Sequence, residues 1–79
     1  DAAPQVLEAV ARAAAPTEVL RRLAGSRVRS VRAFVATNAR LPQEELEILA
    51  RDQDRVVRTS AIGAVARRAA AAREASWKG

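Results

Sequence analysis

The sequence predicts an all-α chain, a fragment of a helical solenoid built from about five short helices. Apolar residues recur at helical spacing, two internal prolines, Pro16 and Pro42, interrupt that pattern, and no long stretch alternates with the period of two that is typical of strands. Roughly a quarter of the 79 residues are alanine, and Phe34 and Trp77 are the only aromatic residues. Because so small a core gives little stability, we expect the chain to depend on neighbouring repeats, self-association or a partner.

The first two helices are predicted from apolar stripes beside prolines. Pro4 suits the first turn of a helix, and the stripe that follows it consists of Leu7, Val10 and Ala14. A second helix begins after Pro16 and ends at the Gly25-Ser26 pair. Its stripe consists of Val19, Leu20, Leu23 and Ala24.

Three further helices are predicted in the same way. The third has Val28, Val31, Val35 and Ala36 on one face and fades near Asn38. The fourth begins at Pro42, with Glu44 and Glu45 in the first turn, where the helix dipole favours acids. Its stripe consists of Leu46, Leu49 and Ala50. The fifth runs from about residue 55 to 75, and its expected buried residues are Val57, Ala61, Val65 and Ala69.

Two segments of the chain superimpose when the sequence is shifted so that Pro16 falls on Pro42. Both prolines are expected at tight joints between helices. The other pairs matched by this proline-to-proline shift are Glu18/Glu44, Leu20/Leu46, Leu23/Leu49, Ala24/Ala50, Arg29/Arg55, Val31/Val57 and Arg32/Arg58. Because the matches fall mainly at apolar and joint positions, we interpret them as one repeated supersecondary unit. The chain then divides into a degenerate repeat end (1–15), two repeats (16–41 and 42–66) and a C-terminal cap or tail (67–79).

The repeated pattern, P-x-x-x-L-x-x-L-A followed by a polar stretch and a Val-Arg step, resembles the leucine-rich repeat variant family, a relative of HEAT-like helical repeats. The resemblance covers roughly residues 5–66 and lies in residues 16–24, Val31-Arg32, residues 35–38, residues 42–52 and Val57-Arg58. It implies a right-handed solenoid whose units pair an α-helix with a shorter or 3₁₀ helix. Some family members carry an iron–sulfur domain, but that feature does not transfer to a segment without cysteine.

The composition argues against catalysis and against cofactors. The chain has no cysteine and no histidine, so thiolate metal sites and histidine-based catalysis are excluded for this segment. The four serines lack a base other than Lys78, and Glu44, Glu45 and Glu47 are interpreted as a solvated face. We expect neither a metal nor a cofactor, no membrane span, a cytoplasmic location and no enzymatic activity. Asp1 in place of Met suggests a piece of a longer repeat protein.

The basic residues are concentrated in the first half of the chain. The net charge is +5, and between residues 19 and 41 there are six arginines and no acid. One interpretation is a solvated face; the alternative is a nucleic-acid or other polyanion site. The residues of that alternative site are Arg21, Arg22, Arg27, Arg29 and Arg40.

Other arginines stand at matched positions after a buried valine. We expect Arg32 and Arg58 to hold successive units together by bonding acids or carbonyls. Asp52 lies before the last helix, within reach of either. Phe34 is expected in core or inter-unit packing.

The leading functional prediction is a protein–protein interaction scaffold or small structural subunit, because stacked helical units present a continuous concave surface. Its predicted partner-binding residues are Arg21, Arg22, Arg29 and Trp77. The alternative for Trp77 is that it folds back over the last helix as a lid.

Overall fold

The computed structural model describes residues 3–76, which form five α-helices and no strand. In chain order these are α1 (Pro4–Arg12), α2 (Thr17–Ala24), α3 (Arg29–Ala36), α4 (Gln43–Leu49) and α5 (Arg55–Ser76). The all-α prediction is confirmed, and the helices that follow Pro16 and Pro42, α2 and α4, are also α-helical. The right-handed sense of the solenoid stays a prediction. No helix within residues 3–76 is both long and apolar enough to cross a membrane.

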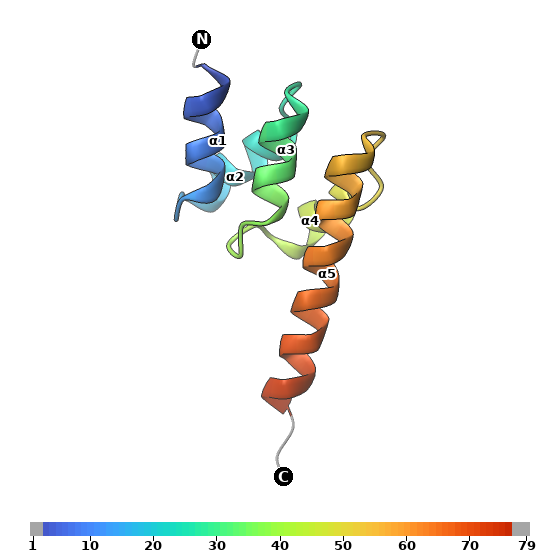
Figure 1. Ribbon diagram of the computed structural model, residues 1–79. Helices are drawn as coiled ribbons and strands as arrows, with labels where there is room; N and C mark the ends of the chain where they lie inside the picture. Colours follow the sequence, from blue (N-terminus) through green and yellow to red (C-terminus); the bar gives the residue numbers. More distant parts are fainter. Residues whose placement is uncertain (1–2, 77–79) are drawn as a thin grey trace.

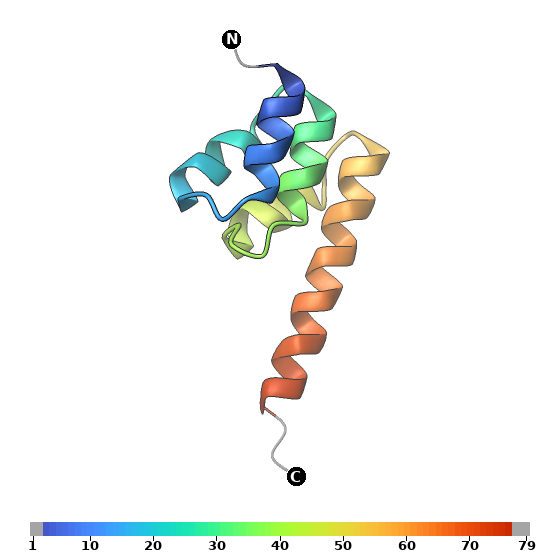
Figure 2. The same cartoon turned by 60° about the vertical axis from the view of Figure 1, so that its left-hand side comes forward.

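The helices lie in two layers (Figures 1 and 2). In one layer α3 packs between α1 and α5. In the other layer α2 and α4, here called the short helices, contact each other, and each packs against the helix that follows it. The shift that brings Pro16 onto Pro42 also brings the start of α2 onto that of α4, and the start of α3 onto that of α5. The helix starts thus recur at the spacing of the sequence matches.

Proline sets the start of each short helix. Pro16 and Pro42 have φ of −58° and −57°, which their rings impose, and extended ψ of 148° and 146°. The helix begins at the next residue in both cases, and the proline carbonyl accepts the backbone N–H of Leu20 or Leu46 at 3.1 Å. The same residue type therefore gives the same joint in both places.

The core lies between the two layers and is made of aliphatic side chains. Its largest fully buried members are Leu20, Leu41, Leu46, Val31, Val35 and Val57. Three expectations were wrong. Val19, which was expected on the apolar stripe of α2, is 37% exposed. Ala14 is exposed, because α1 ends at Arg12, and Ala11 and Ala15 are buried instead. Ala69 is exposed as well, and the C-terminal part of α5 projects beyond the other helices (Figure 1).

The projection of α5 has a local cause. By the same proline-to-proline shift, Asn38, Leu41 and Pro42 correspond to Ala64, Arg67 and Arg68. The loop and the proline that separate α3 from α4 are thus replaced by residues that favour a helix, and α5 continues to Ser76. Arg68 then donates to the carbonyl of Asn38 at 3.2 Å and to the side chain of Gln43 at 3.1 Å, which holds the helix against the preceding loop.

Candidate functional site

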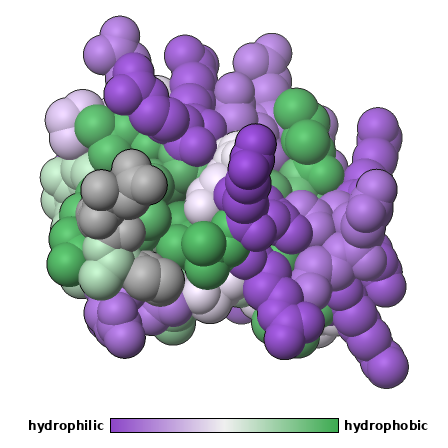
Figure 3. Space-filling model, turned by 90° about the horizontal axis from the view of Figure 1, so that it is seen from above, coloured by the Kyte–Doolittle hydropathy of each residue, from purple (hydrophilic) through white to green (hydrophobic). Residues whose placement is uncertain are grey.

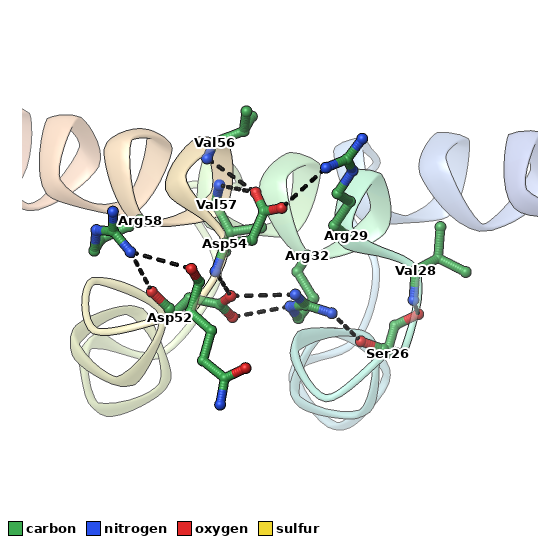
Figure 4. A network of polar contacts seen from close by, with 10 residues as sticks. Ser26, Val28, Arg29, Arg32, Asp52, Asp54, Val56, Val57 and Arg58 are labelled. Atoms are coloured by element: carbon green, nitrogen blue, oxygen red, sulfur yellow. Dashed lines mark hydrogen bonds and ion pairs between the residues drawn. The ribbon is translucent and has the colours of Figure 1, made fainter.

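Arg32 joins the two repeated segments through its guanidinium group (Figure 4). Its Nε and Nη2 donate to the two carboxylate oxygens of Asp52 at 2.9 and 3.1 Å, and its Nη1 donates to the carbonyl of Ser26 at 2.7 Å. The Arg32 and Asp52 side chains are only 19% and 13% exposed. A two-pronged charged contact of this kind is geometrically specific and stronger than a neutral hydrogen bond.

Asp52 and Asp54 shape the turn that leads into α5. Asp52 accepts the backbone N–H of Asp54 at 2.8 Å, and Asp54 accepts those of Val56 and Val57 at 2.9 and 3.1 Å. Partial burial raises the pKa of Asp52, but the hydrogen bonds from Arg32 and from the Asp54 N–H outweigh it, so that this pKa lies below its ordinary value. The pKa of Asp54 is also lowered, first by the Val57 N–H bond and also by Arg29.

Arg58 repeats half of the Arg32 arrangement. Its Nη1 donates to the carbonyl of Asp52 at 2.9 Å, six residues earlier, just as Arg32 binds Ser26 six residues earlier. The same Nη1 also lies 3.2 Å from the carbonyl oxygen of Gln53. Arg58 therefore touches the backbone of Asp52 and not its carboxylate, which points toward Arg32 (Figure 4).

Asn38 makes a second inter-unit contact, which the sequence reasoning missed. Its side-chain amide donates to the carbonyls of Ala11 and Ala13, each at 2.7 Å, and its Oδ1 accepts the backbone N–H of Arg40 at 2.9 Å. The residue is 7% exposed and is the one buried polar residue among residues 3–76. It binds carbonyls at the C-terminal end of α1, where helices leave such groups without partners.

The predicted basic cluster is divided by the fold. Arg21 lies 3.4 Å from Glu45 and Arg29 lies 3.3 Å from Asp54, so acids of the following unit partly neutralise both. Both arginine side chains stay accessible, at 51% and 75% exposed. Arg22, Arg27 and Arg40 are exposed and form no ion pair within residues 3–76. The five residues therefore do not act as one unopposed positive patch.

The remaining sequence candidates fall in different places. Phe34 is half-buried against the core, and the Arg12 guanidinium lies 4.9 Å from its ring centroid. Trp77 lies outside the described residues. Within residues 3–76 no three of the carboxylate-bearing residues are grouped so that they could hold a metal ion.

The outer side of the short-helix layer carries mixed chemistry. Arg22 on α2 and Ile48 on α4 occupy matched positions of the two units, and both are exposed. Ile48 is 68% exposed, the highest value among the exposed large hydrophobic residues of the described chain. Exposed acids at Glu18, Glu44 and Glu47 belong to the same two helices. In the view from above, too, hydrophobic atoms form separate patches among long hydrophilic side chains (Figure 3).

Comparison with known proteins gives one match. The model of the family described as leucine rich repeat variant matches residues 29–54. This segment spans one repeat length, since it runs from the first residue of α3 to the residue before α5, and it confirms the resemblance expected from the sequence. No curated protein and no solved structure matches the chain.

Proposed function

We propose that this chain, which carries a leucine rich repeat variant unit at residues 29–54, is a non-catalytic scaffold that binds another protein. The observation that carries the proposal is the exposed pair Arg22 and Ile48 on neighbouring short helices. Position 22 stays exposed although a further unit follows it in the stack. The exposure of Ile48 at the matched position is therefore a property of this face and not of the end of the chain.

The composition of this face favours a protein partner. An exposed isoleucine between an arginine and several acids suits a surface that is part apolar and part charged, since arginine is enriched at protein interfaces and their buried centre is more apolar than the rest of the surface. Arg21 on α2 is accessible enough to add contacts at its edge, and Arg29 on α3, which is also accessible, is kept as a proposed contact residue outside this face. Trp77 is retained as a proposed contact residue from the sequence. The proposal also places the chain in the cytoplasm.

Site-specific cross-linking tests this proposal. A photoreactive residue replaces Ile48 in the full chain, and a control chain carries it at Arg73, an exposed position on the projecting part of α5. We expect one reproducible cross-linked protein from an extract of the source cells for position 48 only. Excess unlabelled chain should compete, and excess Arg22→Glu/Ile48→Asp chain should not. Equal cross-linking from both positions, or equal competition by both chains, contradicts the proposal.

Polyanion binding is the rival function, through Arg21, Arg22, Arg27, Arg29 and Arg40. The ion pairs to Glu45 and Asp54 count against it, and so do the acids on the α2–α4 surface. Phosphate binding weakens steeply with salt, by about 10³–10⁵ between 50 and 200 mM for six to ten contacts. Salt-sensitive binding of a labelled DNA duplex, measured by fluorescence anisotropy and reduced by Arg21→Ala/Arg22→Ala, is the result that would favour this rival.

A further inference from the structure

The outward face of α5 is exposed where the matched face of α3 is buried. Ala36 is fully buried because α5 and α4 follow it in the stack, whereas Ile62 at the matched position of α5 is 53% exposed. Positions 22 and 48 behave differently, because Arg22 is exposed even though a unit follows it, and so is Ile48. The exposure of Ile62 therefore reflects the absence, within residues 3–76, of a unit that packs on this side of α5.

Arg58 shows the same incompleteness in its hydrogen bonds. Arg32 uses Nη1 for a carbonyl of its own unit and Nε and Nη2 for the Asp52 carboxylate of the next unit. Arg58 uses Nη1 for the matched carbonyl, and its Nε and Nη2 donate no hydrogen bond to any of residues 3–76. Figure 4 shows it on the side of Asp52 that is opposite to Arg32. In Arg32 the Nε and Nη2 groups bind a carboxylate. The same two groups of Arg58 thus have no acceptor within residues 3–76.

A hollow lies at the same end of the stack. Ala50, Ile62 and Val65 supply its apolar lining, and Glu47 and Arg51 supply charged groups. Its volume is about 200 Å³, enough for one or two large side chains. Glu47 corresponds to Arg21, which pairs with Glu45 of the next unit. An occupant that follows the pattern would therefore place a basic residue near Glu47.

Within residues 3–76, the chain does not turn back from α5 to supply this occupant. In the preceding unit the chain leaves α3 at Thr37 and turns at Pro42 into α4. The matched segment of α5 has no such break, and α5 continues without interruption from Ile62 to Ser76. At about 1.5 Å per residue, the helix from Ile62 to Ser76 carries the chain about 20 Å beyond the residue that matches the end of α3.

We propose that the outward face of α5 docks a helical-repeat unit of another protein, which continues the stack. The partner places an aspartate, three residues before its long helix as Asp52 stands before Arg55, on the open edge of Arg58. An apolar face of the partner covers Ile62, and a basic residue faces Glu47. The face continues an interface already present within the chain, since α5 packs on α3 in the same way.

An insertion tests whether the face accepts a repeat unit. A second copy of residues 37–62 is placed after Ile62 of the full chain, so that the copied Asp52 follows Arg58 by 20 residues, the spacing from Arg32 to Asp52. In the natural chain we expect Arg58→Ala to lower the melting temperature less than Arg32→Ala. In the extended chain, Arg58→Ala should lower the melting temperature as much as Arg32→Ala does. Changing the copied Asp52 to Ala should make the effect of Arg58→Ala small again. An unchanged, small effect of Arg58→Ala in a folded extended chain overturns the proposal.

Cross-linking in the natural chain tests which molecule docks on the outward face of α5. It also tests the proposal if the extended chain does not fold. With a photoreactive residue at Val65, we expect a cross-link to a helical-repeat protein from the source-cell extract, lost with Arg58→Ala and kept with the control Arg55→Ala. Peptide mapping should place the cross-link beside an aspartate-bearing loop. A cross-link to a second copy of this chain, or none that depends on Arg58, overturns the proposal. Position 48 reports separately on the short-helix surface, so the two proposals can fail independently.

Discussion

Replacing Arg32 with alanine is the most direct test of how the two units are held together. The substitution removes two hydrogen bonds to Asp52 and one to the Ser26 carbonyl, and it leaves a carboxylate that is only 13% exposed without its cation. Breaking a fully buried ion pair costs about 3–5 kcal/mol. Asp52 keeps its bond from the Asp54 N–H and some contact with water, so we expect a loss of about 2–3 kcal/mol in the free energy of unfolding. For a domain of this size the melting temperature should fall by about 10–20 °C.

Urea denaturation followed by circular dichroism measures this loss, and the chain provides a matched control. Arg58→Ala removes the equivalent carbonyl bonds but no carboxylate contact, and it should cost about 1 kcal/mol. Arg32→Lys should recover only part of the loss, because lysine cannot donate to both oxygens in the fixed geometry of arginine. If Arg32→Ala and Arg58→Ala cost the same in the natural chain, the carboxylate contact contributes nothing and the reasoning fails.

Three other predictions concern stability. Asn38→Ala should lower the free energy of unfolding by about 2–3 kcal/mol, because two carbonyls at the end of α1 lose their donor. Hydrogen exchange of backbone amides should become faster in α1 before it does elsewhere. Unchanged exchange in α1 would contradict this prediction. Leu46→Ala, at a fully buried position, should lower the free energy of unfolding by about 2–5 kcal/mol. Ile48→Ala, two residues away and 68% exposed, should change it by less than about 0.5 kcal/mol. Similar losses for the two variants in chemical denaturation would refute the assignment of these residues to the inner and outer sides of α4. The lowered pKa of Asp52 adds stability that is complete above its ordinary pKa of 3.8 and is lost as pH falls through the lower folded-state value. Asp52→Asn should therefore make the free energy of unfolding, measured by urea denaturation at a series of pH values, fall less steeply below this pH.

The helix starts were predictable because their causes are local. Pro16 and Pro42 fix a backbone angle wherever they occur, and the leucine stripe after each proline needs only helical spacing to be recognised. The repeat that these prolines mark then indicated which segments are neighbours. It therefore placed Asp52 within reach of both Arg32 and Arg58, although it did not distinguish between them.

The sequence did not show that two arginines of the basic cluster lie beside acids, for a reason that the repeat itself supplies. A stretch without acids along the chain is not a stretch without acids in space, because the next unit lies beside it. Arg29 meets Asp54, which is 25 residues later. The role of Asn38 was hidden for a related reason, since its partners lie 25 and 27 residues earlier, at the end of α1, and nothing in its own neighbourhood indicates them.

The central position of α3 has a consequence for how the molecule opens. Because α3 is the helix that contacts both α1 and α5, either outer helix can detach while α3 keeps one neighbour, but α3 cannot unfold without releasing both. In a stack that is coupled only between nearest neighbours, local opening therefore begins at the ends and reaches the middle last. Backbone amides of α3 should exchange with solvent at the rate of global unfolding, while those near Ser76, where α5 projects beyond the other described helices, should exchange fastest among the helical residues.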